Sequence, residues 1–162
     1  MKKTFIAVMI AALAIVANAE ELALNMPFHA GRKSPIAGWD TDVENKDQVK
    51  VADGKLALPR KVRIFTCNMF ACKAGDVFEI EVKATGSGRL LIGIGIWNSE
   101  GYVKDVAETV IIKAGENTFK VEIPVTDSAI RKASKARVSI LAGSNSKDVI
   151  IENVIATLKP KE

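Results

Sequence analysis

Apolar and polar residues alternate with a period of two through most of this chain, which predicts β-strands with one buried face. The clearest segment is 77–83, where Phe78, Ile80 and Val82 alternate with charged residues. A longer apolar strand is predicted at 89–97. The remaining predicted strands follow the same pattern and cover 49–51, 56–58, 62–67, 107–112, 118–125, 136–142 and 148–158.

Turn-forming residues separate these segments. Asp53 and Gly54 predict a tight hairpin turn, because this pair readily adopts the positive φ angles that the turn requires. One short helical turn is predicted around 128–134, and no connection is long enough for the helix that joins parallel strands. Eight or nine antiparallel strands are therefore expected. The other predicted turns are 74–76, 85–88, 98–101, 113–117 and 143–146.

The inward-facing residues of these strands are sufficient to fill one apolar layer between two sheets about 10 Å apart. The chain is therefore predicted to be all-β, an antiparallel two-sheet β-sandwich, and we favour a jelly-roll arrangement. Such a core needs neither a metal ion nor a disulfide. The expected core residues are Phe78, Ile80, Val82, Leu90, Ile92, Ile94, Ile96, Phe119, Val121, Ile123, Val138 and Ile140.

The first 19 residues have the pattern of a signal peptide: two lysines, a short apolar run and a small-x-small end at Ala17-Asn18-Ala19. We expect cleavage after Ala19, which leaves 20–162 as a single β-sandwich domain without a membrane span, periplasmic or secreted and bacterial. Cleavage removes two lysines and no acid, so the net charge falls from +4 to +2. Because the remaining lysines are interleaved with acids, no nucleic-acid partner is expected.

The composition excludes much common enzyme chemistry. The 162 residues are 48% hydrophobic, 26% charged and 6% aromatic, which suits an ordinary folded domain. The only histidine is His29, so neither a histidine-rich metal site nor a serine-histidine triad is available. Cys67 and Cys72 are too few for a disulfide-built scaffold.

Several stretches resemble carbohydrate-binding modules with the galactose-binding-like jelly-roll fold. They are Leu22-x-x-Asn25-x-x-Phe28-x-x-Gly31 with Pro35-x-x-Gly38-Trp39, Cys72 to Ile80, Gly115 to Pro124, and Ile151-Glu152-Asn153-Val154. The resemblance implies a polysaccharide or oligosaccharide partner. It also implies a structural calcium ion, for which Glu152 is the one acidic residue at a matching position, because His29 stands where the family has an acid. The alternative is that both residues are solvated surface residues.

The strand 89–97 is the most informative segment for a binding site. Gly93 and Gly95 share one face with Trp97, and glycines within a strand mark a close approach of a ligand or backbone, or a bend. A sugar site needs an aromatic surface and hydrogen-bonding groups. Trp97 can equally cap the core at the strand end. The candidate ligand-binding residues are Trp97, Asn98, Glu100 and Tyr102, joined by Arg63 and Phe65 if their strand lies alongside.

Export would expose Cys67 and Cys72 to oxidising conditions that permit a disulfide. On one extended strand the two residues would stand about 16 Å apart and point to opposite faces, which is too far for a bond. Pairing therefore requires a turn or bulge at 68–70, and the sequence leaves both alternatives open.

Three functions suit these features. The first is an exported, non-catalytic carbohydrate-binding module that recognises a glycan on an open sheet face or at a loop end. The second is a structural or adhesive β-sandwich of the cell envelope that binds protein partners. The third is a glycosidase-like enzyme using Glu79 with Glu81, or Glu100 with Asp105. Because no motif makes one of these carboxyls a protonated acid, we predict that the chain is not an enzyme.

Overall fold

The structure, a computed structural model, describes residues 20–22, 28–32, 36–126 and 134–161. Most of these residues lie in strands, and the one helical segment among them is a single 3-10 turn, η1 (Val43–Asn45). The strands are β1 (Glu20–Leu22), β2 (Trp39–Thr41), β3 (Lys50–Ala52), β4 (Lys55–Leu58), β5 (Arg63–Thr66), β6 (Phe70–Cys72), β7 (Val77–Asn98), β8 (Gly101–Ile112), β9 (Asn117–Pro124), β10 (Ser134–Ala142) and β11 (Lys147–Lys159).

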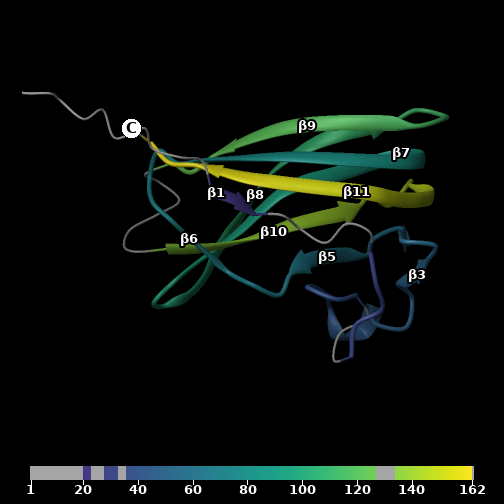
Figure 1. Cartoon of the computed structure of the whole chain (residues 1–162), viewed down its shortest axis with the longest axis horizontal. Helices are drawn as coiled ribbons and strands as arrows, with labels where there is room; N and C mark the ends of the chain where they lie inside the picture. The colour runs from purple at the N-terminus through teal and green to yellow at the C-terminus, as the bar shows by residue number, and fades with distance from the viewer. Residues whose placement is uncertain (1–19, 23–27, 33–35, 127–133, 162) are drawn as a thin grey trace, which may run out of the picture.

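The strands form two antiparallel sheets that share β7, so the molecule is a two-sheet β-sandwich of the jelly-roll type, as predicted (Figure 1). Sheet A has the order β9-β7-β11-β4-β3, with β1 also paired to β11. Sheet B has the order β2-β5-β10-β7-β8, with β6 also paired to β10. Every one of these pairings is antiparallel.

β7 passes from one sheet to the other without ending. Its first part, as far as Ser87, pairs with β9 and β11, and its second part, from Gly88, pairs with β8 and β10. At this point Gly86 and Gly88 have φ angles of 115° and 110°, which glycine adopts without strain. The predicted turn at 85–88 is therefore wrong as a strand end, because these glycines bend a continuous strand instead.

Ser146 holds this bend in place. Its hydroxyl donates a hydrogen bond of 2.7 Å to the carbonyl of Arg89 and accepts one of 3.1 Å from the amide of Arg89. A Cβ on Gly88 would lie 2.5 Å from the Cα of Ser146, so the connection between β10 and β11 packs directly on the bend. Ser146 is buried, and both bonds lie partly within the protein.

The alternation of the sequence predicts the core correctly. Ile80 of sheet A and Ile92 of sheet B are almost completely buried, as are the other predicted inward residues except Phe119, which is half-buried and packs on the core. Burial of each such side chain contributes about 1.5–3 kcal/mol. The predicted hairpin is confirmed, because β3 pairs with β4 and the turn residues Asp53 and Gly54 both have positive φ angles.

One strand begins earlier than predicted, and two short strands were not predicted. β8 begins at Gly101 rather than at 107, because its exposed edge carries little apolar alternation for the sequence to reveal. The short strands β2 and β6 were also not predicted, since three residues give no readable period. The helical turn expected around 128–134 lies outside the described residues except for Ser134. The signal peptide expected at 1–19 lies wholly outside them.

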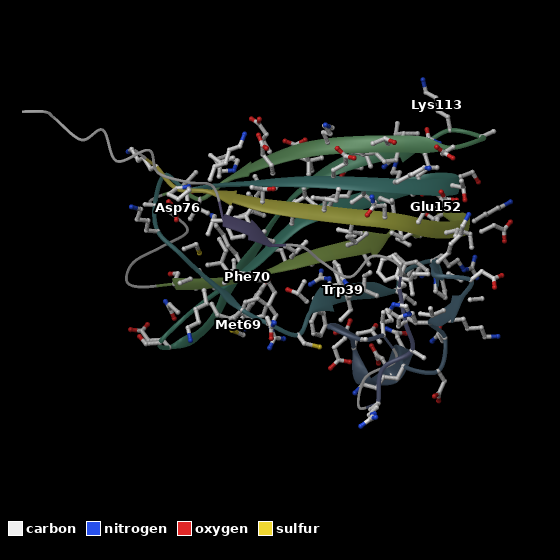
Figure 2. The ribbon with its side chains drawn as sticks, viewed as in Figure 1. Trp39, Met69, Phe70, Asp76, Lys113 and Glu152 are labelled. Carbon is white, nitrogen blue, oxygen red and sulfur yellow. The ribbon has the colours of Figure 1, made fainter. Side chains whose placement is uncertain are left out.

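Two groups of contacts, an aromatic one at Trp39 and a polar one at Asp76, stabilise the sandwich (Figure 2). Trp39 is fully buried against Phe28, with ring centroids 6.3 Å apart. The Asp76 carboxylate accepts hydrogen bonds from the amides of Lys73 at 2.8 Å and Lys161 at 3.1 Å, which ties the end of β11 to the start of β7. Among the described residues, no helix has the length and apolar character to span a membrane.

Candidate ligand-binding site

The outer face of sheet B carries a pocket of about 370 Å³. Its lining comes from four neighbouring strands and from the loop after β2, so residues far apart in the sequence meet there. The central row of the pocket follows from strand register, because Gly95 pairs with Arg137 on one side and with Asp105 on the other. The lining residues are Asp42, Arg63, Phe65, Gly95, Trp97, Tyr102, Asp105, Arg137 and Ser139.

The two glycines of β7 make room for different neighbours. A Cβ on Gly95 would lie 2.8 Å from two ring carbons of Trp97, so the indole folds back over this glycine. A Cβ on Gly93 would lie 2.1 Å from the carbonyl oxygen of Val106, so this glycine admits the backbone of β8. Gly93 therefore marks a close approach of the backbone, one of the alternatives that the sequence offered, while Gly95 makes room for the Trp97 ring.

A β-bulge sets the position of Tyr102. Ile96 pairs with Lys104, whereas Trp97 pairs with Tyr102, so β8 contains one extra residue at this point. The shift puts Tyr102 directly across from Trp97, and their rings meet edge to face with centroids 5.3 Å apart. Burial and the nearby Asp105 carboxylate raise the pKa of Tyr102, so its phenol stays protonated and able to donate a hydrogen bond at neutral pH.

Arg137 projects from β10 between two aromatic rings. Its guanidinium carbon lies 5.3 Å from the ring centroid of Phe65 and 5.3 Å from that of Trp97. Cation–π attraction to both rings holds the guanidinium in one orientation. Its Nε is buried and has no hydrogen-bond partner within the described part of the chain.

Arg63 and Asp105 form an ion pair across the pocket, with Nη1 and Oδ2 2.7 Å apart. Arg63 belongs to β5 and Asp105 to β8, and the strands β10 and β7 lie between them. The pair can reach across these strands because the intervening positions include the small residues Ser139 and Gly95. Both side chains remain about one-third exposed, so their polar atoms are accessible from the pocket.

The structure brings four of the six predicted residues together in this pocket. Arg63 and Phe65 on β5 line the same pocket as Trp97 and Tyr102, although β5 does not lie alongside β7 as the sequence analysis supposed, because β10 lies between them. Asn98, at the end of β7, and Glu100, in the turn that follows, do not line this pocket. Asn98 accepts a hydrogen bond of 2.8 Å from the Glu100 amide, so it shapes the turn.

A second pocket, of about 410 Å³, lies on the other side of Trp97. Its lining includes Met69, from the connection between β5 and β6 (Figure 2), together with Asn98, Ser99 and Lys135. Because Trp97 lines both pockets, they form two adjoining depressions with the indole between them.

The sequence did not single out Arg137, Ser139 or Asp42 as site residues. Arg137 and Ser139 alternate with buried residues in β10, so their outward direction could be predicted. Their neighbours could not, because the pairing of β10 with β7 and β5 joins distant parts of the chain. Asp42 lies in a loop, where no period applies.

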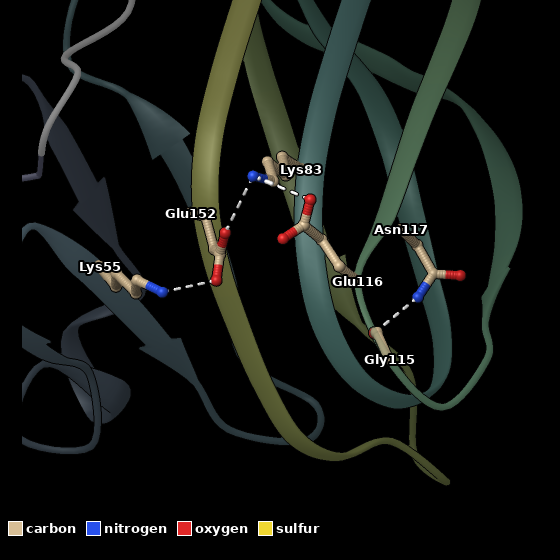
Figure 3. A network of polar contacts seen from close by, with 6 residues as sticks. All are labelled: Lys55, Lys83, Gly115, Glu116, Asn117 and Glu152. Atoms are coloured by element: carbon tan, nitrogen blue, oxygen red, sulfur yellow. Dashed lines mark hydrogen bonds and ion pairs between the residues drawn. The ribbon is translucent and has the colours of Figure 1, made fainter.

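Glu152 lies among lysines, and a calcium ion at this residue stays a prediction. One of its carboxylate oxygens lies 2.6 Å from the Lys55 ammonium and the other lies 3.5 Å from that of Lys83, which also contacts Glu116 (Figure 3). The hydrogen bond from Lys55 and the nearby charges of Lys55 and Lys83 lower the pKa of Glu152. Within the described residues, no cluster of three acidic, histidine or cysteine side chains could hold a metal ion.

Cys67 and Cys72 are free thiols in the structure, the first exposed and the second buried. Three residues, 67–69, separate β5 from β6, and both strands pair with β10, so the segment between the cysteines is not one extended strand. Burial and the negative charge of Asp76 raise the pKa of Cys72 to about 11. A disulfide between the two cysteines stays a prediction.

No known protein family and no curated protein sequence matches the chain. Solved structures do match its fold. A family 29 carbohydrate-binding module complexed with mannohexaose has a TM-score of 0.53 at 14% identity, over 86% of this chain and 92% of the other. A family 4 carbohydrate-binding module has a TM-score of 0.51 at 16% identity, over 76% and 86%.

An arabinose-bound α-L-arabinofuranosidase is also similar, with a TM-score of 0.50 at 12% identity, but the match covers 87% of this chain and only 26% of the enzyme. At these identities the likeness concerns the fold and not the ligand. The chain therefore has the β-sandwich jelly-roll fold that these carbohydrate-binding modules share.

Proposed function

We infer that this protein is an exported, non-catalytic binding protein for a polysaccharide or oligosaccharide, and that the glycan lies in the pocket on the outer face of sheet B. The observation that carries the proposal is the arrangement around Trp97. Its indole is half-buried over Gly95, beside Tyr102 and near Phe65, and it borders two adjoining pockets.

The chemistry of the pocket suits a sugar ring. A pyranose presents an apolar C–H surface that packs on aromatic rings, and a rim of hydroxyls that need donors and acceptors. Phe65, Trp97 and Tyr102 supply the aromatic surface, while Ser139 and Asp42 supply accepting oxygens. Fixing the side chains beforehand, as the Arg63–Asp105 ion pair does, reduces the entropy lost on binding.

Two pockets on either side of one tryptophan favour a chain over a single sugar. A ligand that fills both pockets must pass over the indole, so Trp97 would contact an internal residue of an oligosaccharide. We therefore expect affinity to rise with chain length until both pockets are filled. The fold likeness to a module complexed with mannohexaose is consistent with this proposal.

The carboxylates of the described surface favour binding without catalysis. Glycoside hydrolysis needs one carboxyl with a raised pKa that remains protonated. In the pocket, Asp105 forms an ion pair with Arg63 and Asp42 is exposed, so the two carboxylates are not arranged as a catalytic pair around one apolar site. The pKa of Glu79 is lowered, chiefly by its hydrogen bond from Lys159, which is opposite to the requirement for a general acid.

Binding can be tested by isothermal titration of the mature protein with soluble polysaccharides and their oligosaccharides. Trp97→Ala and Phe65→Ala should each lower the affinity at least tenfold, because each removes part of the aromatic surface. Ile111→Ala is the matched control, since Ile111 is 62% exposed on β8 and lies outside both pockets. Equal affinity in the Trp97 and Ile111 variants would refute the site.

The alternative, a structural or adhesive protein of the cell envelope, has one supporting observation. β8 pairs only with β7 among the described strands, and its free edge carries exposed Val103 and Ile111. Such an edge is a template for pairing with another strand. Concentration-dependent assembly that Ile111→Lys abolishes, together with no glycan binding, would favour this alternative.

A further inference from the structure

Among the described residues, Arg137 has aromatic contacts but no anionic partner. Its guanidinium is stacked between Phe65 and Trp97, and no carboxylate of the described chain forms an ion pair with it. Gly95 of β7 pairs in register with Arg137 on one side and with Asp105 on the other, but the Asp105 carboxylate forms its ion pair with Arg63. Because the Nε of Arg137 is buried without a partner as well, this cation is fixed, partly dehydrated and not neutralised.

Lys135 extends this feature to the second pocket. It lies two residues before Arg137 on the outer face of β10, about 7 Å away along the strand, and it is exposed. Lys135 lines the second pocket, and no acidic residue lines that pocket. Like Arg137, it forms no ion pair with any described residue.

These two positions contrast with the charged residues of sheet A. On that sheet four of the six strand lysines are paired with acids, as in Lys120 with Glu81, Lys159 with Glu79, and Lys83 with Glu152. Lys50, Arg89, Lys104 and Lys147 also lie on described strands without an ion pair, but they lie outside both pockets. Lys135 and Arg137 are left unmatched where the candidate binding surface lies, one in each pocket.

We propose that the ligand is an anionic glycan, and that Arg137 and Lys135 bind acidic groups on sugars on the two sides of Trp97. This inference rests on the proposed function and specifies its substrate class. An arginine fixed by stacking presents a planar fork that matches a carboxylate or sulfate bidentately, and charge-assisted bonds of this kind are about twice as strong as neutral ones. The acid is either a uronate carboxylate or a sulfate ester, which share this chemistry.

Asp42 and Asp105 do not prevent such binding. The Asp105 charge is compensated by Arg63, and Asp42 is exposed at the rim, where solvent and salt screen it. The two pockets together contain three cationic side chains against two carboxylates. An acidic group bound beside Arg137 would complete the pairing that the fold leaves open.

The test compares four probes by isothermal titration: an oligogalacturonate, its methyl ester, dextran sulfate and a neutral manno-oligosaccharide. We expect the oligogalacturonate to bind about tenfold to hundredfold more tightly than its ester, and Arg137→Gln to remove this preference. Arg137→Lys should keep only part of the preference for the free acid, because an ammonium group neither stacks on aromatic rings nor binds a carboxylate bidentately. Tighter binding of dextran sulfate that also depends on Arg137 would identify the acid as a sulfate ester.

Arg89→Gln is the matched control, since Arg89 is an exposed arginine on β7 outside both pockets. If it lowers the affinity as much as Arg137→Gln, binding is unspecific ion pairing and the inference fails. It also fails if the free acid binds no more tightly than its ester and dextran sulfate binds no more tightly than the neutral glycan. Binding of the neutral glycan alone, lost in Trp97→Ala, would overturn the inference and leave the proposed function intact. Failure of every probe would overturn both.

Discussion

Replacing Gly93 and Gly95 separately by alanine tests how the two glycines of β7 shape the site. In Gly93→Ala the new Cβ would lie 2.1 Å from the carbonyl oxygen of Val106 and 2.5 Å from the Cα of Ala107. Both are backbone atoms of β8, which cannot rotate away as a side chain can. The substitution must therefore push β7 and β8 apart, in the middle of their eleven-pair register.

The two possible effects of Gly93→Ala on stability differ in sign. In an unobstructed strand, alanine is more stable than glycine by about 0.5–1 kcal/mol. Forcing an extra carbon into a packed site destabilises by about 1–3 kcal/mol or more, and contacts this short belong at the upper end. We expect a net loss of about 2–3 kcal/mol, or a fall in melting temperature of roughly 5–10 °C for a domain of this size.

Gly95→Ala should behave differently. Its Cβ would lie 2.8 Å from the ring of Trp97 and 3.0 Å from Oδ1 of Asp105, which are side-chain atoms. The indole can move outward, so the loss of stability should stay below about 1 kcal/mol. The same movement disturbs the aromatic wall, and glycan affinity should fall at least tenfold.

Urea unfolding followed by circular dichroism, with titration calorimetry on the same samples, measures both quantities. The expected pattern is a stability defect in Gly93→Ala and a binding defect in Gly95→Ala. The reasoning is refuted if Gly93→Ala is as stable as the wild type, or if Gly95→Ala binds glycan normally.

Three further outcomes are expected. Native protein should show one reactive thiol, from exposed Cys67, because Cys72 is buried and its pKa is raised to about 11. Unfolded protein should show two reactive thiols. The absence of a reactive thiol in both states would instead establish the disulfide. Ser146→Ala should lower the free energy of unfolding by about 1–3 kcal/mol, since both groups of Arg89 that it bonds lose a partner; an unchanged urea midpoint would contradict this. The melting temperature should be the same in calcium and in EDTA, because the ammonium groups of Lys55 and Lys83 contact the Glu152 carboxylate. A higher melting temperature in calcium would instead support the metal site.

The core was predictable because a strand assigns side chains to its two faces by simple alternation. Ile80 and Ile92 could be placed inside from their own neighbours in the sequence, and both are buried. The Asp53–Gly54 turn was equally local, since its φ angles depend on those two residues. The bend in β7 was not, because Gly86 and Gly88 have the same local signature in a turn and in a bent strand.

The site was predictable only in part, for the same reason. Trp97 and Tyr102 belong to one hairpin, so their proximity follows from a short stretch of sequence. Arg137 comes to Trp97 through the pairing of β10 with β7, which is set by packing of the whole sandwich. The effect of Lys55 and Lys83 on Glu152 depends in the same way on strands that meet only in the folded chain.

The central claim is that a glycan binds against Trp97, and intrinsic tryptophan fluorescence tests it most directly. Trp39 is fully buried and Trp97 lines the two pockets, so Trp97 is the tryptophan that a ligand can reach. We predict a saturable change in emission when mature protein is titrated with oligosaccharides, and no change in Trp97→Ala. An emission that no glycan alters, or an equal response in Trp97→Ala, would contradict the account.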